Sequence, residues 1–248
     1  MKDRLFEIFS NRPDRFRLLH KGLEQIAFAK DGFEQIKAME IGCGYGDASA
    51  YVAQRYDYSV TGIDITEQKV EFAKQRHVQT IQARSLAFLT ADTMKLPVQD
   101  KSFDFVFAEA AFSPLGDKRK AAREWHRILK NDGYILINDF AIKNHDTAST
   151  RETVAHIPCF AGVDTIERYE KHLTSEGFRP LAVKEEYGEL IRLALWISKS
   201  LDVDIGAAGG YLSRYYNANG GASCEAASED NDFFKQSQLT YCQMIFKK

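Results

Sequence analysis

The chain is poor in cysteine and proline and has no long apolar run. Its 248 residues include 4 Cys and 5 Pro, and the cysteines lack the paired spacing of a zinc site. The longest apolar stretch, Phe103 to Phe112, is interrupted by Asp104 and Glu109 and is too short to span a bilayer. The N-terminus, Met1-Lys2-Asp3-Arg4, lacks the apolar core of a signal peptide. We therefore expect a cytoplasmic protein with reduced thiols, without a membrane partner or a metal site.

The chain also lacks an excess of charge of either sign. Lys and Arg number 33, Asp and Glu 35, and the net charge is −2. Nucleic-acid binders usually show a basic excess, so we expect no nucleic-acid partner. The composition, 44% hydrophobic and 27% charged, is typical of globular proteins. We expect one domain over residues 1–248 that buries its core without disulfides, and the composition leaves its oligomeric state open.

Strand and helix patterns alternate through the first 180 residues. The apolar spacing predicts strands at 36–41, 59–65, 86–89, 103–108 and 134–140. It predicts helices at 47–55, 66–74, 118–129 and 164–175, whereas 77–85 stays ambiguous. Asn131-Asp132-Gly133 predicts a turn. The alternation indicates an α/β fold, a doubly wound and mostly parallel sheet with helices on both faces.

The two ends of the chain have different patterns. Residues 1–30 are predicted to be helical, and Pro13 is expected to begin a second helix at its first turn. Residues 190–201 form an apolar helix pattern, and 241–246 a final strand. Between them, 203–232 holds five glycines and an acidic run, which predicts loops or flexible chain.

The most informative segment is Glu40-Ile41-Gly42-Cys43-Gly44-Tyr45-Gly46-Asp47, where a strand gives way to a helix. Glycines here allow a sharp turn and a close approach by a ligand. A dinucleotide fingerprint needs a third glycine at 47, but Asp47 stands there, and its charge would repel a pyrophosphate. The segment therefore favours a nucleoside ligand without a pyrophosphate over a nicotinamide cofactor.

Four further segments follow in order. Asp64 ends the second strand, 18 residues after Gly46, where doubly wound folds place an acid on ribose hydroxyls. After it come the segments 91–94, 103–109 and 127–134. Each is weak alone, but the five together form a consistent series.

In order and spacing, these five segments resemble the class I S-adenosylmethionine-dependent methyltransferases over roughly residues 35–185. The resemblance implies a Rossmann-like sheet of seven strands with an antiparallel last strand, S-adenosylmethionine as cofactor and a small-molecule acceptor. It further implies a helical lid at 1–35, a cofactor-binding core at 36–140 and an acceptor side at 141–248.

The resemblance also implies roles for individual residues. Gly42, Cys43, Gly44 and Gly46 form the loop under the methionine and ribose, and Glu40 lies near the methionine amino group. Asp64 holds the ribose and Ile65 packs on adenine. The residues expected around the adenine and along the cofactor toward its methyl group are Asp92, Thr93, Met94, Glu109 and Phe112.

The acceptor stays open. The segment 61–74 is similar to arsenite methyltransferases, and Cys159 stands where those enzymes carry a metalloid-binding cysteine, with Cys224 as a possible partner. A buried structural role for Cys159 is the alternative. The chain equally resembles ubiquinone/menaquinone-type enzymes. Glu109, His145 and His156 are further candidates for chemistry, and a non-catalytic cofactor-binding protein is a third interpretation.

Overall fold

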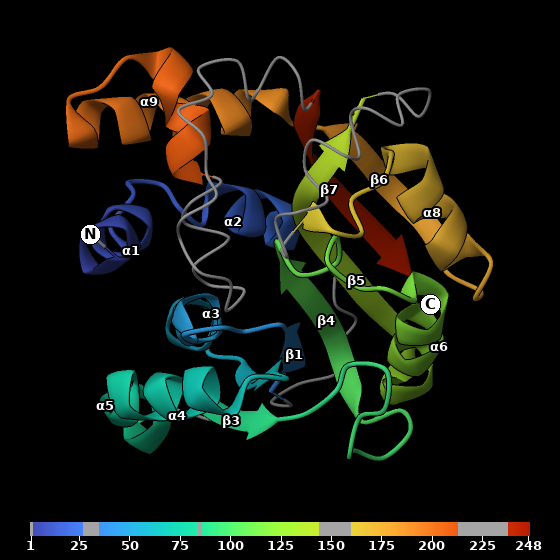
Figure 1. Ribbon diagram of the computed structural model, residues 1–248. Helices are drawn as coiled ribbons and strands as arrows, with labels where there is room; N and C mark the ends of the chain where they lie inside the picture. Colours follow the sequence, from blue (N-terminus) through green and yellow to red (C-terminus); the bar gives the residue numbers. More distant parts are fainter. Residues whose placement is uncertain (1, 27–34, 84–85, 144–159, 213–237) are drawn as a thin grey trace.

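The computed structural model describes residues 2–26, 35–83, 86–143, 160–212 and 238–248. Its centre is a seven-stranded sheet in the order β3-β2-β1-β4-β5-β7-β6 (Figure 1). β7 is antiparallel to β5 and β6, and the other pairs are parallel. The predicted α/β fold with an antiparallel last strand is confirmed. The strands are β1 Lys37–Ile41, β2 Ser59–Asp64, β3 Leu86–Thr90, β4 Phe103–Glu109, β5 Leu129–Ile142, β6 Arg179–Glu185 and β7 Leu239–Lys247.

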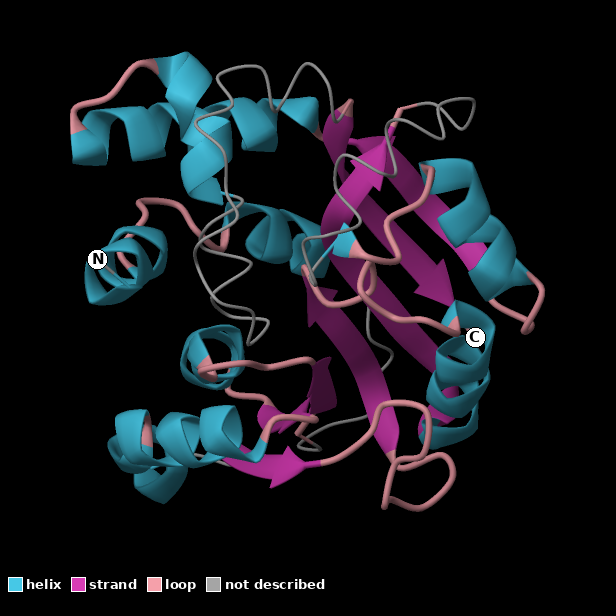
Figure 2. Ribbon diagram, in the orientation of Figure 1, coloured by secondary structure: helices cyan, strands magenta, loops and turns pink. Residues whose placement is uncertain are grey.

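Helices cover both faces of the sheet (Figure 2). On one face, α3 contacts β2, α4 contacts β3, and α2 contacts β5 and β7; on the other, α6 and α8 pack together, and α8 packs on β6. In Figure 1, α1 lies between α9 and the group of α3, α4 and α5. The helices are α1 Lys2–Ser10, α2 Arg17–Glu24, α3 Asp47–Tyr56, α4 Glu67–Arg76, α5 Val78–Ala83, α6 Lys118–Ile128, α8 Ile166–Thr174 and α9 Tyr187–Leu201, followed by the short 3-10 helix η2 Ile205–Ala207.

The sheet separates two cores, because successive residues of a strand point to opposite faces. In β4, Phe105 and Phe107 face α2 and α3, whereas Val106 and Ala108 face α6 and α8. A central parallel strand that is buried on both faces needs a continuous apolar run. This requirement explains the unbroken pattern that made β4 recognisable in the sequence.

A third apolar cluster lies beyond the carboxyl end of β5. Phe9 of α1, Phe140 of β5 and Leu193 of α9 belong to it, and all three are buried. This cluster joins the first and last thirds of the chain and places α1 and α9 beside the edge of the sheet where β1, β2 and β4 end. Among the described residues, no helix is both long and apolar enough to cross a membrane.

Three expectations need correction. Pro13 does not begin a helix; it lies in a turn in which Asp14 has φ 55°, and α2 begins only at Arg17. Asn131-Asp132-Gly133 lies within β5, as an irregularity where the register with β4 shifts. The described part of 203–232 is not loop throughout, because Ala208 and Leu212 are helical and fully buried. The rest of that stretch lies outside the described residues.

The sequence pattern also contains no sign of β6. This strand is at the edge of the sheet, so its side chains are mostly exposed or half-buried. Its second residue is Pro180, which edge strands tolerate. Without a buried face, the strand lacks the apolar period that marks the others.

Candidate functional site: a cleft at the carboxyl ends of the strands

A cleft opens where β1, β2 and β4 end, beneath the turn between α1 and α2 and beside α9. Ligands of open α/β sheets bind at this edge. Its walls come from seven separate parts of the chain. The lining residues are Phe9, Arg12, Arg15, Phe16, Leu18, Glu40, Gly42, Cys43, Gly44, Tyr45, Asp47, Ala48, Asp64, Lys69, Glu109, Ala110, Phe140, Glu189, Leu190, Leu193 and Tyr241.

The three glycines of the loop after β1, Gly42, Gly44 and Gly46, differ in the space around them. All three have positive φ, of 65°, 52° and 80°. A Cβ on Gly42 would lie 2.6 Å from Ala111 Cβ, and one on Gly46 would lie 2.5 Å from the Phe88 ring. A Cβ on Gly44 would meet nothing within 4 Å. Gly42 and Gly46 are therefore required by packing, whereas Gly44 leaves the cleft open.

Asp64 ties this loop to the end of β2. Its Oδ2 accepts a hydrogen bond from Gly44 N at 3.0 Å and its Oδ1 accepts one from Thr66 N at 2.9 Å. The carboxylate is buried but lines the cleft. Ile65, the next residue, is 72% exposed. The strand end thus presents a fixed carboxylate beside an uncovered apolar side chain.

Two carboxyl groups of raised pKa share the cleft. Burial raises the pKa of Glu40 to about 8, although Ser49 Oγ donates a hydrogen bond to it, and the nearby charge of Glu109 adds to the rise. Glu109 is partly exposed, and desolvation inside the cleft raises its pKa to about 8 against a hydrogen bond of 2.6 Å from Asn138 Nδ2. A positively charged ligand would favour ionisation of both groups.

Asp47, at the start of α3, is instead surrounded by nitrogen atoms of three side chains. Arg15 Nη1 lies 2.7 Å from Oδ2, Arg76 Nε 2.8 Å from Oδ1 and His77 Nε2 3.2 Å from Oδ1. Burial alone would raise the pKa of Asp47, but the hydrogen bonds from His77 and Arg15 outweigh it and hold the pKa well below its usual range. Asp47, whose charge disfavours a pyrophosphate at this position, therefore joins the α1–α2 turn to α3 and α4.

The N-terminal segment closes one side of the cleft through long-range contacts. Arg17 of α2 forms an ion pair with the buried Glu189 of α9, and Trp196 Nε1 of α9 donates to Ile8 O of α1 at 2.8 Å. At the other end of the cleft, the Phe6 ring packs edge-on against Tyr45 of the glycine loop at 4.8 Å. Helix α1 thus contacts both rims.

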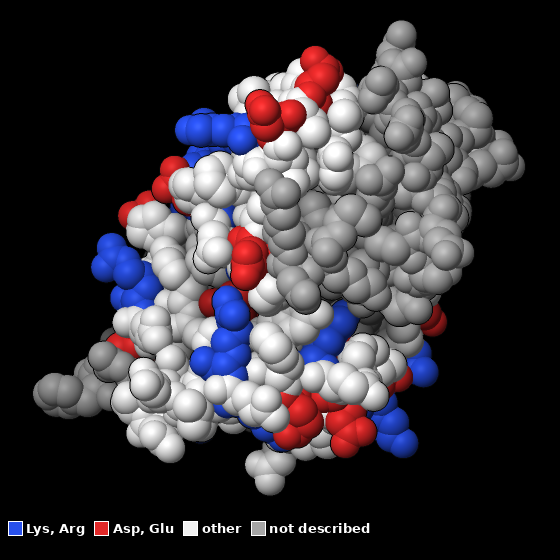
Figure 3. Space-filling model, turned by 60° about the vertical axis from the view of Figure 1, so that its left-hand side comes forward, with Lys and Arg blue, Asp and Glu red and all other residues white. Residues whose placement is uncertain are grey.

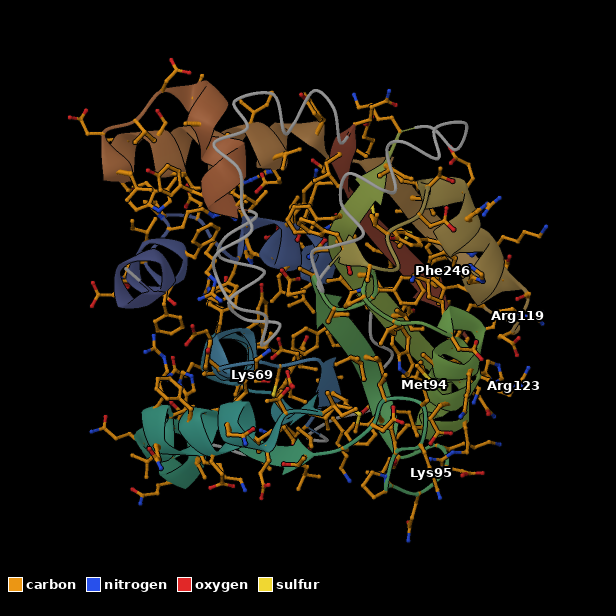
Figure 4. The ribbon with its side chains drawn as sticks, viewed as in Figure 1. Lys69, Met94, Lys95, Arg119, Arg123 and Phe246 are labelled. Atoms are coloured by element: carbon orange, nitrogen blue, oxygen red, sulfur yellow. The ribbon has the colours of Figure 1, made fainter. Side chains whose placement is uncertain are left out.

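Acidic and basic side chains alternate on this side of the molecule. Figure 3 shows Lys and Arg beside Asp and Glu across the described surface, without a patch of one sign. Lys69, near the start of α4, adds a cation to the cleft lining (Figure 4). A ligand in the cleft would therefore meet both signs of charge, because Arg12, Lys69 and Asp64 all line it.

Six of the predicted site residues line the cleft, Gly46 and Ile65 lie next to them in the chain, and the other four lie elsewhere. Glu40, Gly42, Cys43, Gly44, Asp64 and Glu109 line the cleft. Asp92 is exposed and accepts a hydrogen bond from Met94 N at 2.9 Å, a local turn. Met94 lies across β4 from Lys69 (Figure 4).

Thr93 and Phe112 face the core instead of the cleft. Thr93 Oγ1 accepts from Trp125 Nε1 at 2.7 Å, and Phe112 is fully buried between Trp125 and Tyr169. Thr93 therefore contacts α6, and Phe112 packs against both α6 and α8. Their positions in the sequence, in the turn after β3 and in the loop after β4, predicted a place at the edge of the sheet but not the direction of their side chains.

Two thiols, those of Cys43 and Cys242, lie among the described residues, and both are buried. Burial raises the pKa of Cys43 and of Cys242 far above the usual range of a thiol. Cys159, Cys224, His145 and His156 lie outside the described residues. Among the described residues, no group of three side chains is arranged to hold a metal ion.

Sequence reasoning missed several residues of the cleft, among them Arg12, Arg15, Lys69, Glu189 and Tyr241. Lys69 lies in the segment 61–74 but has no predicted role there, and the other four lie outside every motif. Glu189 directly precedes the apolar pattern of 190–201, and burial of its charge requires a partner. The others have no signal that the sequence alone could supply.

Residues 39–137 match the protein family described as Methyltransferase domain. The chain is 29% identical over 155 residues to 27-O-demethylrifamycin SV methyltransferase of Amycolatopsis mediterranei (strain S699), a match covering 60% of this chain and 56% of that protein. The chain spans about half the length of the curated relatives it matches.

Two solved structures share the fold. Haemonchus contortus phosphoethanolamine N-methyltransferase 2, in complex with S-adenosyl-L-methionine, has a TM-score of 0.77 at 16% identity, covering 100% of this chain and 56% of that one. The cyclase SpnF has a TM-score of 0.72 at 19% identity, covering 94% and 80%. Over residues 39–137 the chain is therefore similar to the methyltransferase domain family, and its strand order is shared with the fold of these solved proteins.

Proposed function

We propose that this protein transfers the methyl group of S-adenosylmethionine to a small-molecule acceptor. One observation carries the proposal: the carboxyl groups of Glu40 and Asp64 line a single cleft on either side of Gly44, where the backbone is open to a ligand. Relatives whose names describe O- and N-methyltransferases support it.

The residues of the cleft fit the chemistry of this cofactor. Its ammonium and sulfonium groups are cationic, and Glu40 and Glu109 supply carboxylates. The oxygens of Asp64 are suited to ribose hydroxyls, and the exposed Ile65 to the adenine ring. β3 ends beside β2, with Ala91 N donating to Asp64 O at 3.0 Å, which puts Asp92 at the same edge of the sheet. Under this proposal Asp92 and Met94 contact adenine only after the loop that follows β3 adjusts.

The chemistry demands positioning and exclusion of water. The cofactor, when bound, supplies an activated methyl group on a sulfonium. The protein must hold an acceptor in line with it, and such positioning can contribute roughly 7–11 kcal/mol to catalysis. The α1–α2 segment and α9 are placed to exclude water from the cleft. We assign residues 1–35 the role of a lid, 36–140 the binding of the cofactor and 141–248 the acceptor side.

Calorimetry with S-adenosylmethionine, S-adenosylhomocysteine and NAD tests the proposal. We expect the first two to bind and to raise the melting temperature, because a ligand that binds only the folded state stabilises it. NAD should have no effect, since Asp47 stands at the helix start that a pyrophosphate would need. Absence of binding by both cofactor forms would contradict the proposal. Binding without formation of S-adenosylhomocysteine from any small acceptor would instead indicate a non-catalytic cofactor-binding protein.

A further inference from the structure

A chain of hydrogen bonds runs from the backbone of α2 to Glu109. Gln243 Nε2 of β7 donates to Leu18 O at 2.7 Å and to Asn138 Oδ1 of β5 at 3.0 Å. Asn138 Nδ2 then donates to Glu109 Oε1 at 2.6 Å. Asn138 is 0% and Gln243 1% exposed. Such a buried polar chain in the centre of a sheet is costly unless all its members are paired.

The direction of this chain is dictated at its far end. A backbone carbonyl can only accept, so Leu18 O requires the amide nitrogen of Gln243. That nitrogen in turn requires the oxygen of Asn138. The nitrogen of Asn138 is therefore left for Glu109, whose carboxyl group must accept. The orientation of two amides, which their own shapes leave ambiguous, is fixed by the position of α2.

The charges around Glu109 come from three directions. Arg12 and Arg15, on the α1–α2 turn, favour its ionised form, and Asp139 of β5 opposes it. Glu40 of β1 is coupled to it by charge repulsion. The donor from Asn138 also favours the carboxylate. Because desolvation holds the pKa of Glu109 near 8, the group is suited to exchange a proton near neutral pH.

The part of the cleft beyond Glu109 is apolar. Phe9 of α1, Phe140 of β5 and Leu190 and Leu193 of α9 form its walls, with Tyr241 of β7. An acceptor that binds there needs an apolar body. The lining holds charges of both signs, since Arg12 and Arg15 lie there with Glu40 and Glu189, so charge alone does not select the acceptor group. A neutral hydroxyl group on an apolar body enters the cleft without the cost of desolvating a charge.

On this basis, and resting on the proposed methyl transfer, we infer that Glu109 is the general base for a hydroxyl group on an apolar acceptor, with Gln243 as a positioning residue acting through Asn138. In the step, the acceptor O–H bond breaks and its proton passes to the Glu109 carboxylate. The oxygen forms a bond to the methyl carbon as the S–CH3 bond breaks, and the sulfonium becomes a neutral sulfide. The proton leaves Glu109 for solvent after the product departs.

The experiment uses the full chain with S-adenosylmethionine and matched aromatic probes that differ in the acceptor atom. Phenols of graded size, together with aliphatic alcohols, form the hydroxyl arm; 2-naphthylamine, benzylamine and 2-naphthalenethiol form the other arm. Formation of S-adenosylhomocysteine is measured from pH 6 to 9. We expect transfer to hydroxyls, with a rate that rises with pH as Glu109 ionises. If the cofactor binds but methyl transfer occurs only to amines or thiols, or to no hydroxyl, the inference about Glu109 is overturned and the proposed cofactor site stands. Loss of cofactor binding would instead mark failure of the proposed function.

Variants separate the base from the group that positions it. Glu109→Gln should lower kcat at least about a hundredfold and remove the pH dependence, because general-base catalysis contributes about 10²- to 10⁴-fold. Gln243→Glu removes the donor and presents acceptors, which reverses the Asn138 amide. The acid limb of the profile should then move to higher pH, with activity recovered there. Asn138→Asp, which removes the donor beside Glu109, should shift the limb in the same direction and serves if Gln243→Glu does not fold.

The matched control is Gln54→Ala. Gln54 Nε2 of α3 donates to Thr80 Oγ1 of α5 at 2.7 Å, away from the chain that reaches Glu109. This variant should keep the profile of the natural protein. A Glu109→Gln variant with an unchanged profile, or Gln243→Glu and Asn138→Asp variants that fold and show no shift of the limb, would contradict the inference.

Discussion

The two walls of the cleft differ in how their residues are arranged along the chain. The wall at the ends of β1, β2 and β4 uses Glu40, Gly44 and Asp64, which lie close in sequence and at strand ends. The opposite wall joins Arg17 to Glu189, Ile8 to Trp196 and Leu18 to Gln243, pairs separated by 172, 188 and 225 residues. The residues of the first wall lie within two neighbouring sequence segments, whereas those of the second wall come together only when the chain folds.

We expect the two walls to support two different properties, binding of the cofactor and binding of the acceptor. The first wall rests on the sheet, so substitutions there should alter cofactor affinity while the rest of the fold stays in place. The second wall rests on a few ion pairs and hydrogen bonds between α1, α2 and α9. Substitutions there should change the kinetics for the acceptor, through the proposed lid and acceptor side, more than the affinity for the cofactor. Four predictions test this division, in addition to the Glu109 experiment.

The largest effect is expected for Asp64→Ala. If Asp64 holds both ribose hydroxyls, two charge-assisted hydrogen bonds of about 1.5 kcal/mol or more are lost, and cofactor affinity should fall roughly a hundredfold. Calorimetric titration measures this. Asp132→Ala is the control, because that carboxylate is 80% exposed and pairs with Lys247 outside the cleft. Equal affinities of the two variants would remove Asp64 from the cofactor site.

The glycine loop offers a matched pair. Gly46→Ala places a Cβ 2.5 Å from the Phe88 ring at φ 80°, so strain and overpacking should lower the free energy of unfolding by about 3 kcal/mol. Gly44→Ala has open space and φ 52°, and should cost only about 1 kcal/mol while weakening cofactor binding. Denaturant titration and calorimetry report the two quantities. Equal stability of the variants would contradict the packing argument.

The ligand-free protein should lose stability as the pH rises from about 5 to 8. Glu40 has a pKa of about 8 when folded, against 4.5 as its ordinary value. A raised folded pKa contributes stability below the unfolded pKa, and this stability is lost as the pH rises through the folded one. The slope is at most about 1.4 kcal/mol per pH unit, and we expect a total of about 2 kcal/mol. Melting temperatures over this window measure it. Glu109 has the same raised pKa and contributes to the same decline. Glu40→Gln should therefore make the decline shallower without removing it, and a parallel decline in that variant would exclude Glu40 as a source.

The smallest effect is expected from the second wall. Glu189→Gln removes the charge that Arg17 pairs with, and should lower stability by about 1 kcal/mol. It should also reduce kcat/KM for the acceptor, with cofactor affinity nearly unchanged. Glu176→Gln is the matched control: this carboxylate likewise pairs with arginines, Arg119 and Arg123, but lies between α6 and α8, away from the cleft. Equal kinetics in both variants would separate α9 from the acceptor side.

The corrections to the predicted elements have the same origin as the difference between the walls. Pro13 has a sequence suited to a helix start, but Arg12 and Arg15 on either side of it turn toward Glu189 and Asp47. Contacts with distant residues therefore decide the turn. Asn131-Asp132-Gly133 favours a local turn, but the structure holds it as a bulge in β5: Leu129 pairs with Phe103, and the pairing resumes at Tyr134 with Phe105. In both cases a tertiary contact outweighs a local preference.

The sequence by itself determined the central strands, the helices between them and the residues at their carboxyl ends. Burial on both faces demands apolar runs, and a tight strand-to-helix turn demands Gly42 and Gly46, so both leave a local pattern. Only the tertiary structure decided that Glu189 meets Arg17 and that Gln243 reaches Glu109 through Asn138. A single Glu or Gln has no period and no motif, and its partner is chosen by the packing of elements nearly the whole chain apart.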